Sequence, residues 1–149
     1  MAGVGTREQI MAALLARLQA AYPFTVVGRR NVSPDTIAKP GQPALILLKQ
    51  HEFIKNASDM PDMAIRTMTV LACCYFDASG DENAVPDTII NAMTQAIDDN
   101  LRKPDNMLTR RVTLGGLCQS VKIAGQIDNA PGDQTGKGLA IIPIEIVIP

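Results

Sequence analysis

The sequence predicts an α+β domain in which a mainly antiparallel sheet of about four to five strands carries two helices on one face. Two segments repeat apolar residues at helical spacing, and five other segments are rich in β-branched or other apolar residues. Their order along the chain is α, β, β, β, α, β, β, which is typical of an α+β domain. At 149 residues the chain is long enough for one domain, residues 1–149, with a core of its own.

The first helix is expected to begin after Thr6, because the hydroxyl of Thr6 and the side chain of Gln9 can close a capping box. Pro23 ends this helix, since proline cannot continue the backbone ladder. Apolar residues recur between them at steps of four, four and three, which places them on one face: Ile10, Leu14, Leu18 and Ala21.

Three strand candidates follow. Residues 24–29 are short and β-branched, and residues 44–50 form an almost continuous apolar run that suits a central strand covered on both faces. Residues 64–76 are the longest candidate. Proline and glycine break residues 31–43, so this loop is the first place to look for partner contacts. Residues 51–62 are expected to form the second connection.

A polar turn at residues 77–83 leads to the second helix. Pro86 and Asp87 are both favourable in the first turn of a helix. The helix is expected to stop near Leu101, before Pro104. Its apolar face consists of Ile89, Ile90, Met93, Ala96, Ile97 and Leu101.

Strands are expected to fill the rest of the chain. Residues 106–113 begin the fourth strand candidate, which continues through residues 117–127, where apolar and polar residues alternate. Residues 129–138 are rich in turn formers and are expected to form a flexible loop or hairpin tip. Residues 139–148 are a final strand with apolar side chains at every even position. Pro143 lacks a ladder donor, which favours an edge position or a donor facing away from the sheet.

Charge and composition argue against several classes of protein. Lysine and arginine number 14 and the acidic residues 15, giving a net charge of −1, so a protein that wraps nucleic acid or a polybasic membrane protein is not expected. Aromatic residues make up 3%, which argues against a stacking platform for bases or sugars. No apolar run has the length of a membrane helix and no leader pattern opens the sequence, so we expect a cytoplasm-like compartment or a larger particle.

Candidates for catalysis are few. His51 is the only histidine and Glu52 follows it, but a zinc site needs three or four ligands, so no metal is expected. A nucleophile would have to be Cys73 or Cys118 acting with His51, which is the basis of an enzyme alternative. Cys73 and Cys74 are adjacent in a strand candidate and point to opposite faces, so we expect them to be small, reduced core residues.

Glycine pairs and acidic pairs also have structural explanations. Residues 115–116 and 132–138 lack the helix and the Lys-Ser or Lys-Thr of a phosphate loop, so no nucleotide cofactor is expected. Asp81-Glu82 and Asp98-Asp99 lie in a turn and at a helix end, where solvated carboxylates are the default.

Two arginine pairs are the remaining concentrations of charge. Arg29-Arg30 and Arg110-Arg111 are either solvated strand ends or candidates for ion pairs between subunits. The second explanation draws on the planar, multi-donor guanidinium group, which is favoured at interfaces.

Taken together, these segments resemble the tail terminator (minor tail) proteins of long-tailed bacteriophages and related small neck and tail-completion proteins. The resemblance covers most of the chain and rests on the order and spacing of the segments, because none of them is a catalytic signature. The segments are residues 7–21, residues 43–52, residues 87–101 with Ile90-Asn-Ala-Met93, and Thr113-Leu-Gly-Gly-Leu117 with residues 121–125 and 140–149.

The resemblance implies a non-enzymatic subunit that assembles into a six-fold ring and caps the head-proximal end of a tail tube. Its implied partners are further copies of itself, the tail tube protein and a head-completion or connector protein, in a virion assembled in the host cytoplasm. DNA would pass through the lumen without specific binding, because acidic walls let phosphates slide. Candidates for such walls are Asp81, Glu82, Asp98 and Asp99, together with Asp77 and Asp128.

Two alternatives remain open. A different ring at the neck, or a tail-tube subunit, belongs to the same broad class, and a tube subunit would polymerise. The second alternative is a small cytoplasmic enzyme or ligand-binding domain that uses His51 and a cysteine.

Overall fold

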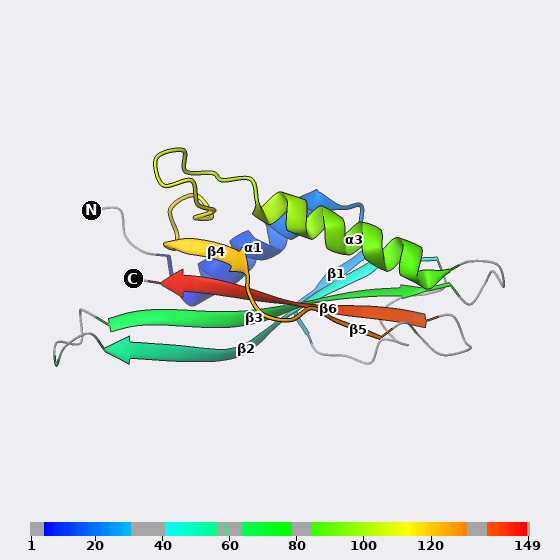
Figure 1. Cartoon of the computed structure of the whole chain (residues 1–149), viewed down its shortest axis with the longest axis horizontal. Coiled ribbons are helices and arrows are strands. Elements are labelled where there is room, and N and C mark those ends of the chain that lie inside the picture. Colours follow the sequence, from blue (N-terminus) through cyan, green and yellow to red (C-terminus); the bar gives the residue numbers. More distant parts are fainter. Residues whose placement is uncertain are drawn as a thin grey trace.

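The computed structural model describes residues 5–30, 41–56, 59, 64–78, 85–130 and 137–148. Within these residues, helices α1 (Arg7–Ala21) and α3 (Pro86–Leu101) lie on one face of a twisted six-stranded sheet (Figure 1). The predicted α+β class is therefore confirmed. The strands are β1 (Val26–Gly28), β2 (Ala44–Asn56), β3 (Ala64–Asp77), β4 (Ser120–Ile123), β5 (Asp128–Ala130) and β6 (Lys137–Ile148).

The sheet is mainly antiparallel, as predicted. Its strand order is β1-β2-β3-β6-β4, and β5 pairs with β6 beyond the end of β4. Only β1 and β2 run parallel, from Val26 opposite Ala44 to Gly28 opposite Ile46. The first half of β2 lies between β1 and β3, and its residues 44–47 are buried, which confirms a central strand covered on both faces.

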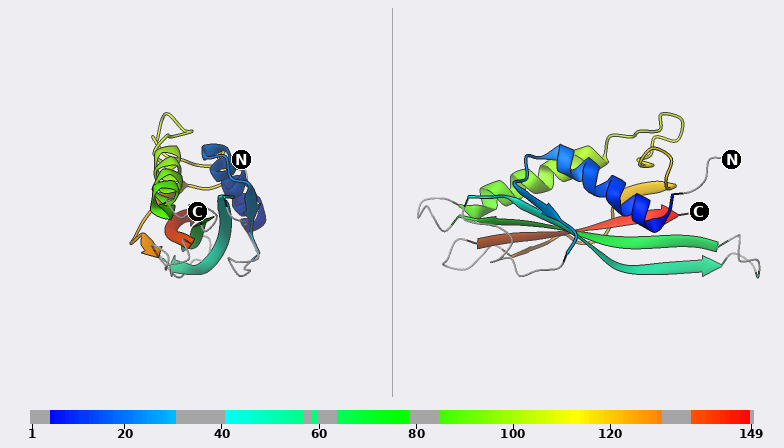
Figure 2. Two further views of the ribbon diagram at one scale, coloured as in Figure 1. Left: turned by 90° about the vertical axis from the view of Figure 1, so that its right-hand side faces the viewer. Right: turned by 180° about the vertical axis from the view of Figure 1, so that it is seen from behind.

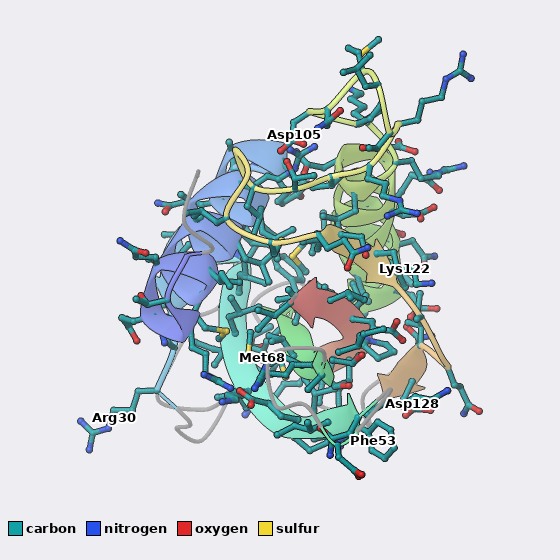
Figure 3. All side chains as sticks on the ribbon, turned by 90° about the vertical axis from the view of Figure 1, so that its left-hand side faces the viewer. Arg30, Phe53, Met68, Asp105, Lys122 and Asp128 are labelled. Carbon is teal, nitrogen blue, oxygen red and sulfur yellow. The ribbon has the colours of Figure 1, made fainter. Side chains whose placement is uncertain are left out.

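The core lies between the sheet and the two helices. Because side chains alternate along a strand, every second residue of β3 and β6 points toward the helices. Met68 of β3 lies in this layer (Figure 3). The even positions of β6 are buried as predicted, at Ala140, Ile142, Ile144, Ile146 and Ile148. The helices contribute Ile10, Met11, Leu14, Leu18, Ile90, Met93, Ile97 and Leu101.

Both helices begin where the sequence predicts. The hydroxyl of Thr6 accepts a hydrogen bond from the backbone N of Gln9 at 3.2 Å, and the Gln9 side chain accepts one from the backbone N of Thr6 at 2.9 Å. Pro86 opens α3. A Cβ at Gly138 of β6 would lie 3.1 Å from Cγ1 of Ile90, so glycine lets α3 pack closely on the sheet. No helix of the described residues has the length and apolar character that a membrane span requires.

Pro143 lies inside β6 without interrupting the main ladder. β4 pairs with residues 144–147 and β5 with residues 139–141, so Pro143 faces the interval between these two strands. On that side its carbonyl accepts a hydrogen bond from the backbone N of Ala124 at 3.1 Å. The N and C=O of one strand residue point the same way, so the missing donor also faces this interval and not β3. β6 is not an edge strand, and the second of the two predicted explanations holds.

β2 is longer than predicted. The strand continues past Gln50 to Asn56, so His51 lies inside it, and the predicted connection at residues 51–62 is wrong for its first half. Residues 52–56 pair with the start of β3 after a register shift between Lys49 and His51. Side chains on both faces of this part are largely exposed, so burial imposes no alternation that the sequence could reveal.

The chain after Pro104 is a turn, and the predicted strand at residues 106–113 is wrong. The Asn106 side chain accepts backbone hydrogen bonds within the turn, and Arg110 has a positive φ of 55°, which ends any extended run. The predicted strand at residues 117–127 shortens to β4, because Gly125 bends the chain at a φ of 111°.

Several predicted loops lie partly outside the described residues. These are residues 31–40 of the first loop, residues 57–58 and 60–62 of the second connection, residues 79–83 of the polar turn and residues 131–136 of the glycine-rich segment. β5 and β6 pair antiparallel, with residue 130 opposite Leu139. This pairing agrees with the hairpin alternative for the glycine-rich segment.

Candidate functional site

The residues of the enzyme alternative do not form a catalytic pair. His51 is exposed and lies opposite Thr69 of β3. Cys73 is four residues further along β3, which corresponds to about 13 Å at the usual rise of a strand. Cys118 is buried, and its thiol lies 3.5 Å from the backbone carbonyl of Thr113. Neither thiol is therefore placed for proton transfer to the imidazole.

The thiols are also poor nucleophiles. Burial raises the pKa of Cys73, raises that of Cys74 to about 12 and raises that of Cys118 to about 11. Because the thiolate is the reactive form, these groups remain protonated near neutral pH. All three cysteines are free, as expected, and Cys74 is a core residue, but Cys73 is only partly buried because it lies on the helix-free side of the sheet. The part of the chain that the structure describes contains no group of three or more residues that could hold a metal ion.

The first exposed apolar feature is an arm formed by residues 52–56 of β2 and residues 64–68 of β3. It extends past the helices at one end of the molecule (Figures 1 and 2). Phe53 is 64% exposed and points away from the core (Figure 3), Ile54 is 50% exposed and Ile65 is 47% exposed. We did not predict this feature, although the Phe53-Ile54 pair inside a polar stretch was the available signal.

The arm continues an apolar surface on the helix-free side of the sheet. Phe53 and Ile65 share that side with alternate residues of β2, β3 and β6. We call this surface the outer face. Its partly exposed apolar side chains include Leu48, Leu71, Cys73, Ile141, Pro143 and Val147.

Glu52 ties the arm to the first helix. Its carboxylate lies 2.6 Å from Nε of Arg7 and 2.5 Å from Nζ of Lys49. Hydrogen bonds from Arg7 and then from Lys49 lower the pKa of Glu52 to about 2. The sequence pointed to Glu52 as a possible partner of His51, but the structure gives it this structural role instead.

The Glu52 contact predicts a pH dependence. Because the pKa of Glu52 is lowered from about 4.5 to about 2, its stabilisation is complete above pH 4.5 and is lost as the pH falls toward 2. Arg7 and Lys49 are 50% and 41% exposed, so we expect a loss of only about 1 kcal/mol. Urea titrations measure the free energy of unfolding at each pH. Between pH 6 and pH 2 this free energy should fall less for Glu52→Gln than for the parent protein. Equal pH slopes for the two proteins would contradict the assignment.

The second exposed apolar feature is the turn at residues 106–111. Met107 is 77% exposed and Leu108 is 97% exposed. Oδ1 of Asn106 accepts a hydrogen bond from the backbone N of Leu108 at 3.0 Å, and the carbonyl of Arg111 accepts one from the backbone N of Asn106 at 3.2 Å. The two apolar side chains therefore project from a hydrogen-bonded turn.

Asp105 and Arg17 fix the base of this turn. The Asp105 carboxylate accepts hydrogen bonds from the backbone N of Thr113 at 2.7 Å, from its hydroxyl at 2.8 Å and from the backbone N of Gly115 at 3.0 Å. Arg17 of α1 lies 3.8 Å from the same carboxylate and donates to two backbone carbonyls at the end of α3, at 2.9 and 2.7 Å. Figure 3 shows Asp105 between the ends of the two helices.

These contacts keep Asp105 ionised. Burial by itself would raise its pKa, but the hydrogen bonds from Gly115 and Thr113 and the charge of Arg17 outweigh it, and the pKa lies below its ordinary value. No sequence motif singled out Asp105. Its position after Pro104, in a run of turn formers, was the available signal.

The four predicted interface arginines have different surroundings. Arg29 pairs with Glu8 of α1 through both of its terminal nitrogens, and these hydrogen bonds lower the pKa of Glu8. Arg30 points away from the molecule (Figure 3). Arg110 and Arg111 are exposed, and no carboxylate of the described residues pairs with them. The charge of Arg29 is therefore satisfied within the chain, whereas Arg110 and Arg111 can pair with a partner.

The predicted acidic lining is only partly available. Asp98 and Asp99 each lie 2.9 Å from the guanidinium of Arg102, so their charge is partly compensated. Asp77 is 6% exposed, and its assignment to a lumen wall is wrong because it is buried at the end of β3. Residues 81–82 lie outside the described part of the chain.

Comparisons with known proteins find a likeness in fold to a virion protein. No protein-family model matches the chain, and no curated protein matches its sequence. Among solved structures, a chain of the virion of a native gene transfer agent particle matches with a TM-score of 0.55 and 15% identity, and the match covers 93% of each chain. The two chains share a fold. At this identity the likeness concerns the fold alone.

Proposed function

We propose that this chain is a structural protein of a tailed, phage-like virion, and specifically a tail terminator. Six copies would form a ring that caps the head-proximal end of the tail tube and joins it to the head. The fold likeness to a virion chain, across 93% of both chains, is the observation that carries the proposal. The partners would be the tail tube protein and a head-completion or connector protein, and assembly would take place in the host cytoplasm.

The exposed surfaces support an assembling subunit. Head-to-tail contacts that close into a ring use two different surfaces of each copy. The described residues offer one such surface in the arm with the outer face. Large exposed apolar side chains grouped in this way are typical of protein contact sites.

Charged residues would complete these contacts. Arg30 is the interface candidate that can pair with a neighbouring copy in the ring, and Arg110 and Arg111 can pair with a neighbouring protein of the particle, while Arg29 supports α1 through Glu8. Asp81, Glu82, Asp98 and Asp99 remain our candidates for a lumen wall along which DNA slides. No cofactor or metal is part of the proposal.

The deciding experiment measures the mass of the purified protein by light scattering, at several concentrations and with tail tubes from the same particle added. A closed oligomer near six subunits, alone or on the tubes, is the expected result. Polymerisation into long tubes would identify a tube subunit instead. A ring that binds head connectors and ignores tubes would identify another neck component, and a strict monomer that ignores the tubes would contradict the whole proposal.

The outer face predicts a specific loss of assembly. Changing Phe53 and Ile65 together to serine removes the two large exposed apolar side chains that the arm contributes to the outer face, and should weaken ring formation by about tenfold or more. The free energy of unfolding of the monomer should change by less than about 1 kcal/mol, because both residues are about half exposed or more.

Val85→Ser is the matched control. Val85 is 60% exposed at the other end of the molecule, where serine is also a good N-cap for α3. If the control disrupts the ring as much as the double variant does, the arm is not a specific contact.

A further inference from the structure

We propose that a pocket between the end of α3, the turn at residues 106–111 and β4 binds an acidic segment of a different protein. This pocket would be a partner site beyond the ring contacts of the proposed function. The proposal rests on that function only because it assumes that the chain works in an assembly of several proteins. The bound segment would carry carboxylate side chains that enter the pocket and an apolar side chain that contacts the rim of the pocket.

The pocket has a volume of about 430 Å³ and is cationic. Its charged lining consists of three arginines and one lysine, and no acidic residue lines it. Ser120 and Gln119 add side chains that can donate hydrogen bonds. The cationic residues are Arg102, Arg110, Arg111 and Lys122, and Lys122 of β4 is labelled in Figure 3.

Half of this positive charge is not compensated within the described residues. Arg102 pairs with the acidic residues at the end of α3, and Lys122 lies 3.9 Å from Glu145. Arg110 and Arg111 have no such partner there. A guanidinium group binds a carboxylate with two parallel hydrogen bonds, so these two arginines supply the specific contacts.

The pocket wall is preorganised. Arg110 has a φ of 55°, a conformation that an L residue adopts only when its surroundings impose it. Those surroundings are the hydrogen-bonded turn at residues 106–111 and the Asp105 carboxylate, which holds Thr113 and Gly115 beyond it. A wall that is ordered before binding loses less conformational entropy when a partner binds.

The rim favours a protein over nucleic acid. Met107 and Leu108 are exposed on the turn that also carries Arg110 and Arg111. Methionine and arginine are enriched in protein interfaces. A nucleic-acid site needs a track of cations that follows several phosphates, whereas the whole chain has a net charge of −1.

The described surface of this chain does not offer a matching segment. Most of its carboxylates are already paired within the chain, including Glu8, Glu52, Asp98, Asp99 and Asp105. The exposed arm carries apolar side chains, but its charges include Lys55 and Arg66. Because the described part of a second copy offers no acidic segment, we take a different protein as the occupant.

Fluorescence anisotropy tests the proposal on the purified full chain. The probe is a short labelled peptide in which glutamate and leucine alternate with serine and glycine, and the comparison probes are the same peptide with glutamine for glutamate and a double-stranded DNA oligonucleotide. We expect salt-sensitive binding of the acidic peptide, weaker binding of the glutamine peptide and weaker binding of DNA at the same salt concentration.

The matched variants are Arg110→Asn with Arg111→Ser, and Arg30→Ser with Arg66→Ser. Each pair removes two positive charges, and asparagine tolerates the positive φ at position 110. The first pair should weaken binding of the acidic peptide by about tenfold or more, and the second by less than about threefold. Urea titration of each variant shows that it folds.

Three results would overturn the proposal: equal binding by both variant pairs, tighter binding of DNA than of the acidic peptide, or loss of self-association in the Arg110 and Arg111 variant. The last would make a second copy the occupant. Light scattering on the same samples separates this inference from the proposed function. A ring that does not bind the peptide removes only the pocket proposal, and peptide binding by a strict monomer removes only the ring.

Discussion

Ile144→Ala is expected to lower the free energy of unfolding by about 3 to 4 kcal/mol, because Ile144 is fully buried and its loss leaves a cavity. Ile144 lies on β6, opposite Val70 of β3 and Ile123 of β4, so three strands and the helices surround it. Urea denaturation monitored by circular dichroism measures the change. The midpoint should shift while the denaturant slope stays constant.

Ile141→Ala is the control for the same strand. Ile141 lies on the outer face and is only partly buried, so its loss should cost about 1 kcal/mol. In the proposed ring this variant should weaken assembly more than folding. Equal destabilisation by both substitutions would contradict the assignment of the helix-covered face as the core.

Asp105→Ala is expected to cost about 2 to 3 kcal/mol, because it leaves three donors of Thr113 and Gly115 without their acceptor. It also removes the charge beside Arg17. The melting temperature should fall by roughly 5 to 10 °C, which differential scanning calorimetry can measure. Binding of the acidic peptide should weaken too, since the carboxylate orders one wall of the pocket.

Asp128→Ala is the matched control for this second prediction. Asp128 is exposed and accepts one hydrogen bond, from Gln126 at 2.7 Å, so the change should stay within about 0.5 kcal/mol. If Asp105→Ala and the control melt at the same temperature, the Asp105 carboxylate does not stabilise the turn.

The sequence predicted those elements whose signals are local. Thr6 and Gln9 mark the start of α1 by their own hydrogen bonds, and Pro86 marks the start of α3 by its fixed φ. Every even position of residues 139–148 is apolar, and strand geometry sends these side chains to one face, which is the buried face in the structure.

The predictions were wrong where the backbone conformation depends on contacts that local composition does not reveal. Residues 51–56 read as a connection because they are polar, yet pairing with β3 extends them into the arm. Residues 106–113 read as a strand because of their composition, yet the side chain of Asn106 and the positive φ of Arg110 make a turn.

The candidate site shows the same division. Arg110 and Arg111 could be predicted as candidates because they are adjacent in the sequence and both carry a guanidinium group. The pocket needs more, because Lys122 comes from β4 and Arg102 from the end of α3. Charges this far apart in the chain meet only through strand register and helix packing.

By itself the sequence determined the fold class, both helices, the inward side of the last strand and the scarcity of catalytic groups, because each depends on residue type and local periodicity. The tertiary structure alone decided the strand order, the apolar outer face, the arm and the Arg17–Asp105 contact that fixes the turn. These depend on pairings between residues that are distant in the chain, and no local pattern encodes the energy of such pairings.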